Sequence, residues 1–252
     1  MRIALLHLDL AVGSVSRNLG LIVEAASRAA DAGADWILTP EVALQGYFFT
    51  DADPAPIIPA MPGPEIAPLS ELAQARQLTL FLGCAERDAA TGLAHNSCVV
   101  LGPEGAVLGR HRKLVVHGQT EAWARPGAAR RPIACNGVSV GALVCADMWY
   151  AENPAAMAAA GAEVLTLAAA WPPGPMGPNG AWERASAETG LPVFVCNQTG
   201  RHRMDMTRAE SAVITGGARR LTYSGADPAI LLFDWDKETG LATEGDFRRI
   251  PA

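Results

Sequence analysis

One cysteine stands where the chain could present a nucleophile. Cys145 directly follows the apolar run 141–144, and a helix is expected soon after it, over residues 153–160. A nucleophile at a turn between a strand and a helix projects from the edge of a sheet, beside backbone N–H groups that can stabilise an oxyanion. The segment therefore predicts thiol chemistry, which needs a general base and a group that stabilises the developing negative charge.

The other four cysteines do not suggest chemistry as clearly. Cys84 and Cys98 lie in apolar runs, and Cys135 is expected in a hairpin turn. Cys196, at the end of an apolar run before Asn197, is the only rival nucleophile. The cysteines lack the Cys-x-x-Cys spacing of a zinc site or a redox dithiol, and the chain has no glycine-rich phosphate loop. We expect no metal and no cofactor.

Two further segments carry groups that could serve a cysteine nucleophile. Glu41 follows the expected strand 35–38, and ligands of α/β sheets bind near the carboxyl ends of such strands. A basic run ends at Lys113, after the expected strand 106–112, and Glu121 comes eight residues later. Taken alone, Glu41 could be a solvated loop residue and the basic run a solvated sheet edge. The five histidines show no local pattern of a base, so a cysteine–histidine hydrolase is a less favoured alternative.

Strand-like and helical runs alternate along the chain, as expected for an α/β protein. The periodicity and the turn residues predict helices over 17–32, 64–77, 153–160 and 181–189. They predict strands over 2–8, 35–38, 79–85, 96–101, 106–112, 131–134, 138–144, 163–168, 193–197, 211–215 and 229–235. The segment 171–180 is so rich in proline and glycine that it can form neither.

A short internal repeat bears on the architecture. Segment 30–39 recurs in similar form as 158–166, and each copy reads as a helix end, a Gly-Ala turn, an acidic residue and a buried strand. A common turn used twice would explain the repeat, and so would two similar α/β halves. Two such sheets packed face to face would form a four-layer α-β-β-α sandwich. Since no linker separates the halves, we expect a single α/β domain over residues 1–252.

Composition excludes several classes of protein. Half of the 252 residues are apolar, 18% are charged and the formal net charge is −6, which is the balance of a folded globular chain. An acidic chain without a basic block is not expected to bind nucleic acid. No stretch reaches the roughly 18 apolar residues of a membrane span, so we expect no membrane association and a cytoplasmic location.

Taken in order, the three segments resemble the nitrilase superfamily of carbon–nitrogen hydrolases. The Pro-Glu that contains Glu41, the Arg-Lys that contains Lys113 and the Cys-x-Asp that begins at Cys145 match its pattern in order and approximate spacing. Supporting matches extend over nearly the whole chain, at 10–13, 18, 33–35, 96–97, 161–163, 197–200 and 210–211.

The resemblance implies the same four-layer sandwich and a Glu-Lys-Cys triad. Glu41 would be the general base for the thiol of Cys145. Lys113 and the backbone N–H of Ala146 would hold the oxyanion of an amide substrate. Glu121 would help to position Lys113 and the substrate. The thioester on the cysteine would then be hydrolysed by water.

Departures from the family pattern narrow the subclass. Nitrilases usually have Trp-Glu after the cysteine, and Ala146-Asp147 stands here, which disfavours nitrile hydrolysis. The run 147–149 is more similar to the glutamine-hydrolysing domain of NAD synthetases, but the length leaves no room for a synthetase domain. We expect a freestanding amidase acting on a small linear amide. Alternatives are a glutaminase-type subunit that supplies ammonia, an N-carbamoyl amide hydrolase and, less favoured, a non-catalytic binding protein.

Aromatic residues near the motif segments suggest the nature of the substrate pocket. Tyr47, Trp149 and Trp171 are the candidates for substrate contacts, and segment 171–180 could form the rim. These residues favour a small, partly apolar amide. Members of the family commonly form homodimers, and we expect a homodimer here.

Overall fold

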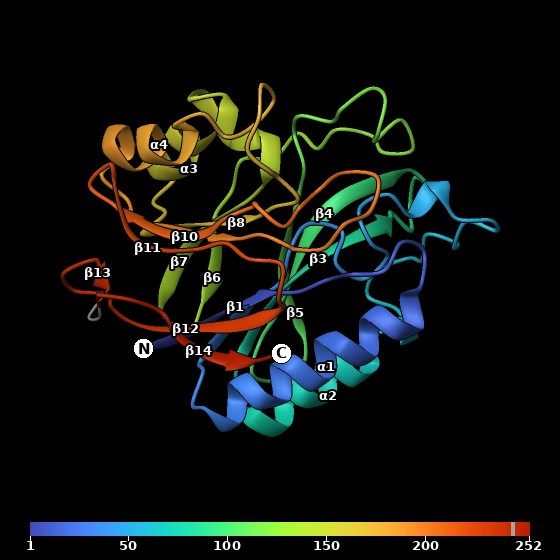
Figure 1. The fold of residues 1–252 in the computed structure, drawn as a ribbon, viewed down its shortest axis with the longest axis horizontal. Helices are drawn as coiled ribbons and strands as arrows, with labels where there is room; N and C mark the ends of the chain where they lie inside the picture. The colour runs from blue at the N-terminus through green and yellow to red at the C-terminus, as the bar shows by residue number, and fades with distance from the viewer. Residues whose placement is uncertain (243–244) are drawn as a thin grey trace.

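The computed structural model describes residues 1–242 and 245–252 (Figure 1). Its α-helices are α1 (Val15–Asp31), α2 (Ala67–Arg76), α3 (Glu152–Ala159) and α4 (Ala181–Thr189). Its strands are β1 (Arg2–His7), β2 (Trp36–Leu38), β3 (Thr79–Arg87), β4 (Ala94–Leu101), β5 (Val107–Arg112), β6 (Ile133–Cys135), β7 (Val138–Val144), β8 (Val164–Ala168), β9 (Val193–Cys196), β10 (Ser211–Thr215), β11 (Ala218–Tyr223), β12 (Ala229–Asp236), β13 (Leu241–Ala242) and β14 (Arg248–Pro251). Short 3₁₀ turns occur at η1 (Phe49–Asp51), η2 (Pro64–Ile66) and η3 (Cys145–Trp149).

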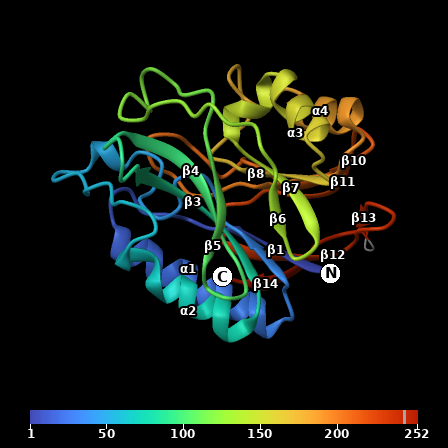
Figure 2. The same ribbon diagram turned by 180° about the vertical axis from the view of Figure 1, so that it is seen from behind.

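The strands form two mixed sheets. The first has the order β13-β12-β1-β2-β3-β4-β5, with β14 also paired to β12, and the second has the order β11-β10-β9-β8-β7-β6. Helices α1 and α2 cover the outer face of the first sheet, and α3 and α4 cover the second, so that the sheets face each other between two helical layers (Figures 1 and 2). The predicted four-layer α-β-β-α sandwich is confirmed.

Strand β1 shows why its sequence is continuously apolar. Ile3 and Leu5 belong to the core that includes both sheets, whereas Ala4 and Leu6 pack in the cluster that includes α1 and α2. Successive side chains of a strand point to opposite faces, so a strand between two packed layers must be apolar on both.

The internal repeat forms the same turn once in each sheet. Gly33 and Gly161 follow α1 and α3 with φ of 86° and 90°, and the next residue's N–H bonds back into the helix, as in a glycine-terminated helix end. The acidic residue then meets the start of the neighbouring strand. Asp35 accepts from the N–H of Arg2 at 2.7 Å, and Glu163 accepts from the N–H of Ser139 at 2.6 Å. The repeat therefore builds equivalent junctions in the two sheets.

Most predicted elements lie within a few residues of their observed bounds, and three differences have physical reasons. The expected helix 64–77 begins as the 3₁₀ turn η2 before α2. Cys135 was expected in the hairpin turn but ends β6; Asn136 and Gly137 make the turn, both at positive φ. Strands β11, β13 and β14 were not predicted, because their exposed residues lack a clear apolar pattern. Among the described residues, no helix is long and apolar enough to cross a membrane.

Candidate active site

Cys145 lies at the junction between β7 and the 3₁₀ turn η3. Its backbone has φ of 46°, a region that a residue with a side chain rarely adopts, and its side chain is almost fully buried. Such strain is typical of functional positions, where the surrounding fold holds the residue in place. Ala146 is the second residue of η3, and the first N–H groups of a helix have no partner within that helix.

Glu41 follows β2, as predicted, and its carboxylate is fully buried. Oε1 accepts from Nζ of Lys113 at 2.7 Å and from Nδ2 of Asn96 at 2.8 Å, and Oε2 accepts from the N–H of Ala170 at 3.1 Å. The backbone before Glu41 lies directly against Gly83 of β3, where a Cβ would come within 1.9 Å of the carbonyl oxygen of Pro40. A glycine is therefore required there for Glu41 to reach its position.

Lys113 and Glu121 complete a buried charged cluster with Glu41. Nζ of Lys113 lies 2.5 Å from Oε1 of Glu121, and the side chain of Lys113 is fully buried. Glu121 also accepts from the N–H of His117 at 2.9 Å and from the hydroxyl of Tyr47 at 3.2 Å. The structure thus brings Glu41 together with two residues that lie more than 70 positions further along the chain.

The cluster shifts the proton affinities of its members in different directions. Burial raises the pKa of Glu41 to about 7, against the opposing attraction of Lys113. Burial also raises the pKa of Glu121, but Lys113 and the N–H of His117 outweigh it, so the net pKa is lowered. Burial lowers the pKa of Lys113, yet Glu41 and the other acidic groups raise it well above its usual range. Lys113 therefore stays an ammonium, and Glu41 is the carboxylate best able to take up a proton.

The thiol itself is held in the neutral form. Burial and the nearby negative charge of Glu41 raise the pKa of the Cys145 thiol well above its usual value. A thiolate is the reactive form of cysteine, so chemistry at this thiol would require a base. Glu41 is the buried carboxylate whose charge acts most strongly on it.

Asn96 and the pair Asp147–His111 hold the cluster in place, and sequence reasoning did not assign them these roles. Asn96 donates to both Glu41, at 2.8 Å, and Glu121, at 3.1 Å. Asp147 accepts from Nε2 of buried His111 at 2.8 Å, and from three backbone N–H groups at residues 114, 115 and 144. This carboxylate therefore ties the segment after Lys113 to the end of β7. In the sequence, Asn96 was noticed only as part of a match to the family pattern, and Asp147 only as the last residue of the Cys-x-Asp motif.

A cavity of about 550 Å³ opens beside the thiol. It is lined by Cys145, Tyr47, Trp171 and Met204 and by segments 117–120 and 172–177. Of the predicted substrate contacts, Tyr47 and Trp171 line it. Trp149 instead packs edge-to-face on Trp171 at 5.2 Å between ring centroids, and its indole N–H donates to the carbonyl of Gly177. Trp149 therefore supports the wall from behind.

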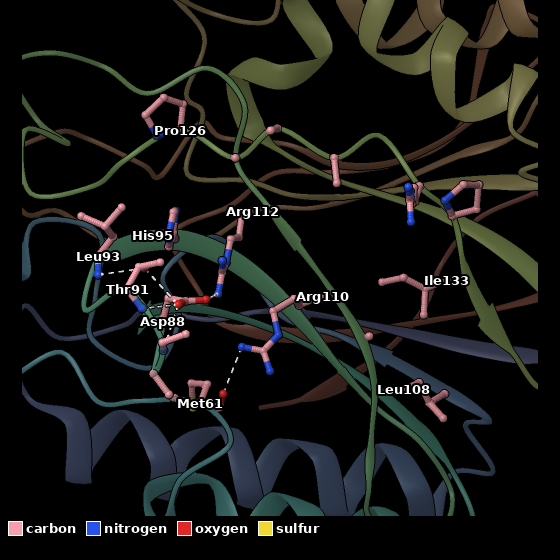
Figure 3. Close-up of a pocket in the computed structure, with 18 of the residues that line it drawn as sticks. Met61, Asp88, Thr91, Leu93, His95, Leu108, Arg110, Arg112, Pro126 and Ile133 are labelled. Atoms are coloured by element: carbon pink, nitrogen blue, oxygen red, sulfur yellow. Dashed lines mark hydrogen bonds and ion pairs between the residues drawn. The ribbon is translucent and has the colours of Figure 1, made fainter.

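A larger groove, of about 920 Å³, lies along β5 (Figure 3). Arg110 and Arg112 project into it, and both are paired with the buried carboxylate of Glu86; Arg112 also pairs with Asp88. Its lining, as far as the chain is described, includes none of the predicted catalytic residues. These arginines join β5 to β3, so the cavity at Cys145 is the better candidate for substrate binding.

The four-layer sandwich is a nitrilase-type fold, which solved structures of low sequence identity share. A solved amidase from Nesterenkonia sp. superposes with a TM-score of 0.76 at 23% identity, over 98% of this chain and 91% of that chain. The chain belongs to the carbon-nitrogen hydrolase family, whose model matches residues 2–227, and is therefore a hydrolase.

Two curated relatives are similar to this chain over about two thirds of its length. An (R)-stereoselective amidase from Pseudomonas sp is 30% identical over 167 residues, which is 66% of this chain and 59% of the relative. A glutamine-dependent NAD(+) synthetase from Xanthomonas campestris pv. campestris is 30% identical over 179 residues, which is 68% of this chain and 32% of the synthetase. The matched regions thus span only part of each relative's length.

Proposed function

We propose that the protein is an amidase that cleaves the C–N bond of a small linear amide through a thioester on Cys145. The observation that carries this proposal is the position of Glu41. One buried carboxylate is hydrogen-bonded to the ammonium of Lys113 and close enough to Cys145 to raise the pKa of its thiol, next to a cavity that Cys145 lines. A base, a nucleophile and a fixed positive charge are thus adjacent, as acyl transfer requires.

In the first half-reaction, Glu41 accepts the thiol proton while the sulfur of Cys145 bonds to the amide carbonyl carbon. The negative charge that develops on the carbonyl oxygen is stabilised by the ammonium of Lys113 and the backbone N–H of Ala146. The C–N bond then breaks as Glu41 returns its proton to the nitrogen, and ammonia or an amine leaves. The acyl group remains on sulfur as a thioester.

In the second half-reaction, Glu41 accepts a proton from a water molecule that attacks the thioester carbonyl. The C–S bond breaks, the carboxylic acid is released, and the sulfur regains its proton from Glu41. A group that both takes and returns a proton works best when its pKa is near the working pH. The pKa of about 7 that burial gives Glu41 meets this requirement.

A glutaminase-type activity is the second candidate, because the similarity to a glutamine-dependent NAD(+) synthetase covers 68% of this chain. As a glutaminase the protein would use the same steps on the side-chain amide of glutamine and supply ammonia to a partner. Comparing the rates on glutamine and on short uncharged amides separates the two candidates. Hydrolysis of N-carbamoyl amides would be detected in the same panel by carbon dioxide release.

The test of the proposal is ammonia release from a panel of short amides by the wild type, Cys145→Ala and Cys135→Ala. Cys135 is also buried, at the end of β6, and serves as a matched control for loss of a thiol from the core. We expect Cys145→Ala to lose turnover and Cys135→Ala to keep it. Equal turnover by wild type and Cys145→Ala would refute the mechanism.

A further inference from the structure

The wall of the cavity beside Cys145 is apolar and fixed in place. Trp171 is buried, its indole N–H donates to the carbonyl of Met176 at 2.7 Å, and its backbone N–H donates to Oδ1 of Asn197 at 2.9 Å. With its polar atom occupied, Trp171 offers the cavity only the apolar surface of its ring. Prolines of segment 172–175 and the thioethers of Met176 and Met204 continue this surface to the mouth.

The two hydroxyl groups at the cavity, on Tyr47 and Thr120, already have partners. The hydroxyl of Tyr47 lies 3.2 Å from Glu121 and 3.3 Å from Thr120. Among the described lining residues, no side chain is a carboxylate, a lysine or an arginine. Arg203, next to Met204, is paired with Asp51 at 3.1 Å and lies over the ring of Phe48, so its charge is engaged outside this wall.

The one cation of the cluster beneath the cavity is already paired with protein carboxylates. Lys113 is shared between Glu41 and Glu121, and its Nζ has hydrogen bonds to both. The ring of His117 lines the cavity, where burial and nearby Lys113 lower its pKa, so it supplies no positive charge at neutral pH. A substrate carboxylate or ammonium against this wall would lose its hydration without gaining an ion pair, which is strongly unfavourable.

We infer that the substrate is an uncharged amide whose acyl group is apolar and lies against Trp171, Met176 and Met204. This inference rests on the proposed amidase activity and assigns its substrate class. It separates the protein from enzymes that select an acyl group bearing a carboxylate or an ammonium, because their sites must supply an opposite charge for that group. It therefore also disfavours glutamine, which carries both charges, as the substrate.

The experiment compares three amides of matched chain: butanamide, succinamate and 4-aminobutanamide. The first ends in a methyl group, the second in a carboxylate and the third in an ammonium, so acyl length is nearly constant while charge varies. We expect kcat/KM for butanamide to be roughly 100-fold higher than kcat/KM for either charged amide or for L-glutamine. This factor corresponds to the free-energy cost of burying a charge that has no partner. Equal or faster hydrolysis of a charged amide would overturn the inference while leaving the amidase proposal intact. If the protein hydrolyses none of these amides and no amide of the wider panel, the amidase proposal itself is refuted.

A charge introduced into the wall tests the placement of the acyl group. Met204 is 36% exposed and Met176 is 66% exposed, so the fold can accommodate a lysine at either position. We expect Met204→Lys to raise the ratio of succinamate to butanamide kcat/KM at least about 10-fold, and Met204→Leu to keep the wild-type ratio. Met176→Lys provides a second, independent position. An unchanged ratio in both lysine variants would show that the acyl group does not lie against this wall.

Discussion

Replacing Lys113 with methionine is a direct test of the buried charged cluster. The ammonium lies 2.7 Å from Glu41 and 2.5 Å from Glu121, and none of the three side chains is more than 1% exposed. Methionine has a similar length but no charge, so Lys113→Met leaves two buried carboxylates without a cation. Removing one partner of a buried ion pair typically costs about 3–5 kcal/mol of the free energy of unfolding, and we expect a loss of this size at pH 7.

The pH dependence of that loss distinguishes charge from packing. Lys113 lowers the pKa of both carboxylates, so in the folded variant the pKa of Glu41 rises still further above 4.5, the ordinary value for glutamate, and the lowered pKa of Glu121 rises as well. The folded variant then binds more protons than its unfolded state, so lowering the pH stabilises it. Urea unfolding at pH 7 and pH 5 should therefore show the difference from wild type shrinking by about half.

A second substitution supplies the control. Glu121→Gln in the Lys113→Met background removes one of the two stranded carboxylates, and we expect it to restore about 1–2 kcal/mol at pH 7. The claim that Lys113 stabilises the two carboxylates electrostatically would be refuted by either of two results. One is a loss in the free energy of unfolding below about 1 kcal/mol for Lys113→Met, and the other is a loss that is the same at pH 7 and pH 5.

Three further outcomes follow from the structure. The kcat/KM of the wild type should rise as the pH increases through about 7, because Glu41 must lose its proton to act as a base; a pH-independent rate would contradict this role. Gly83→Ala should lower kcat at least about 10-fold with KM little changed, since the added Cβ would displace the backbone before Glu41. If this variant has the kcat of the wild type, the contact between Gly83 and that backbone does not position Glu41. Burial lowers the pKa of His7 to about 4, from 6.5 when exposed, so stability is full above pH 6.5 and falls as the pH drops toward 4. Urea unfolding should show a loss of about 2 kcal/mol between pH 7 and pH 5 that is absent in His7→Asn.

The parts of this fold that depend on local sequence could be predicted. Strands β7 and β10 have the predicted bounds because each is a short apolar run that ends near turn residues, and helix α4 has them because it lies between Gly180 and Gly190. The repeated Gly-Ala turn also forms as predicted in both copies. Strand β11 was missed because four of its six residues are exposed or half-exposed at an edge and polar, including Arg219 and Arg220, so its pattern resembles a loop.

The parts of the site that depend on contacts between distant segments could not be predicted in the same way. The order of Glu41, Lys113 and Cys145 was readable, but nothing local indicates that Asn96 would donate to two carboxylates. The direction of a side chain is likewise not local, which is why Trp149 was expected in the cavity yet supports it from behind. The single domain, the homodimer and the cytoplasmic location stay predictions.

The central claim, that Cys145 carries the acyl group, is tested most directly by mass spectrometry of acid-quenched enzyme. The wild type is mixed with butanamide or with 4-nitrophenyl butanoate, whose leaving group departs without needing a proton, and the labelled peptide is identified. We predict that both compounds give the same butanoyl adduct on the peptide that contains Cys145. The adduct should be missing in Cys145→Ala, and this variant should no longer hydrolyse butanamide. An acyl group on Cys196, or undiminished turnover by Cys145→Ala, would contradict the account.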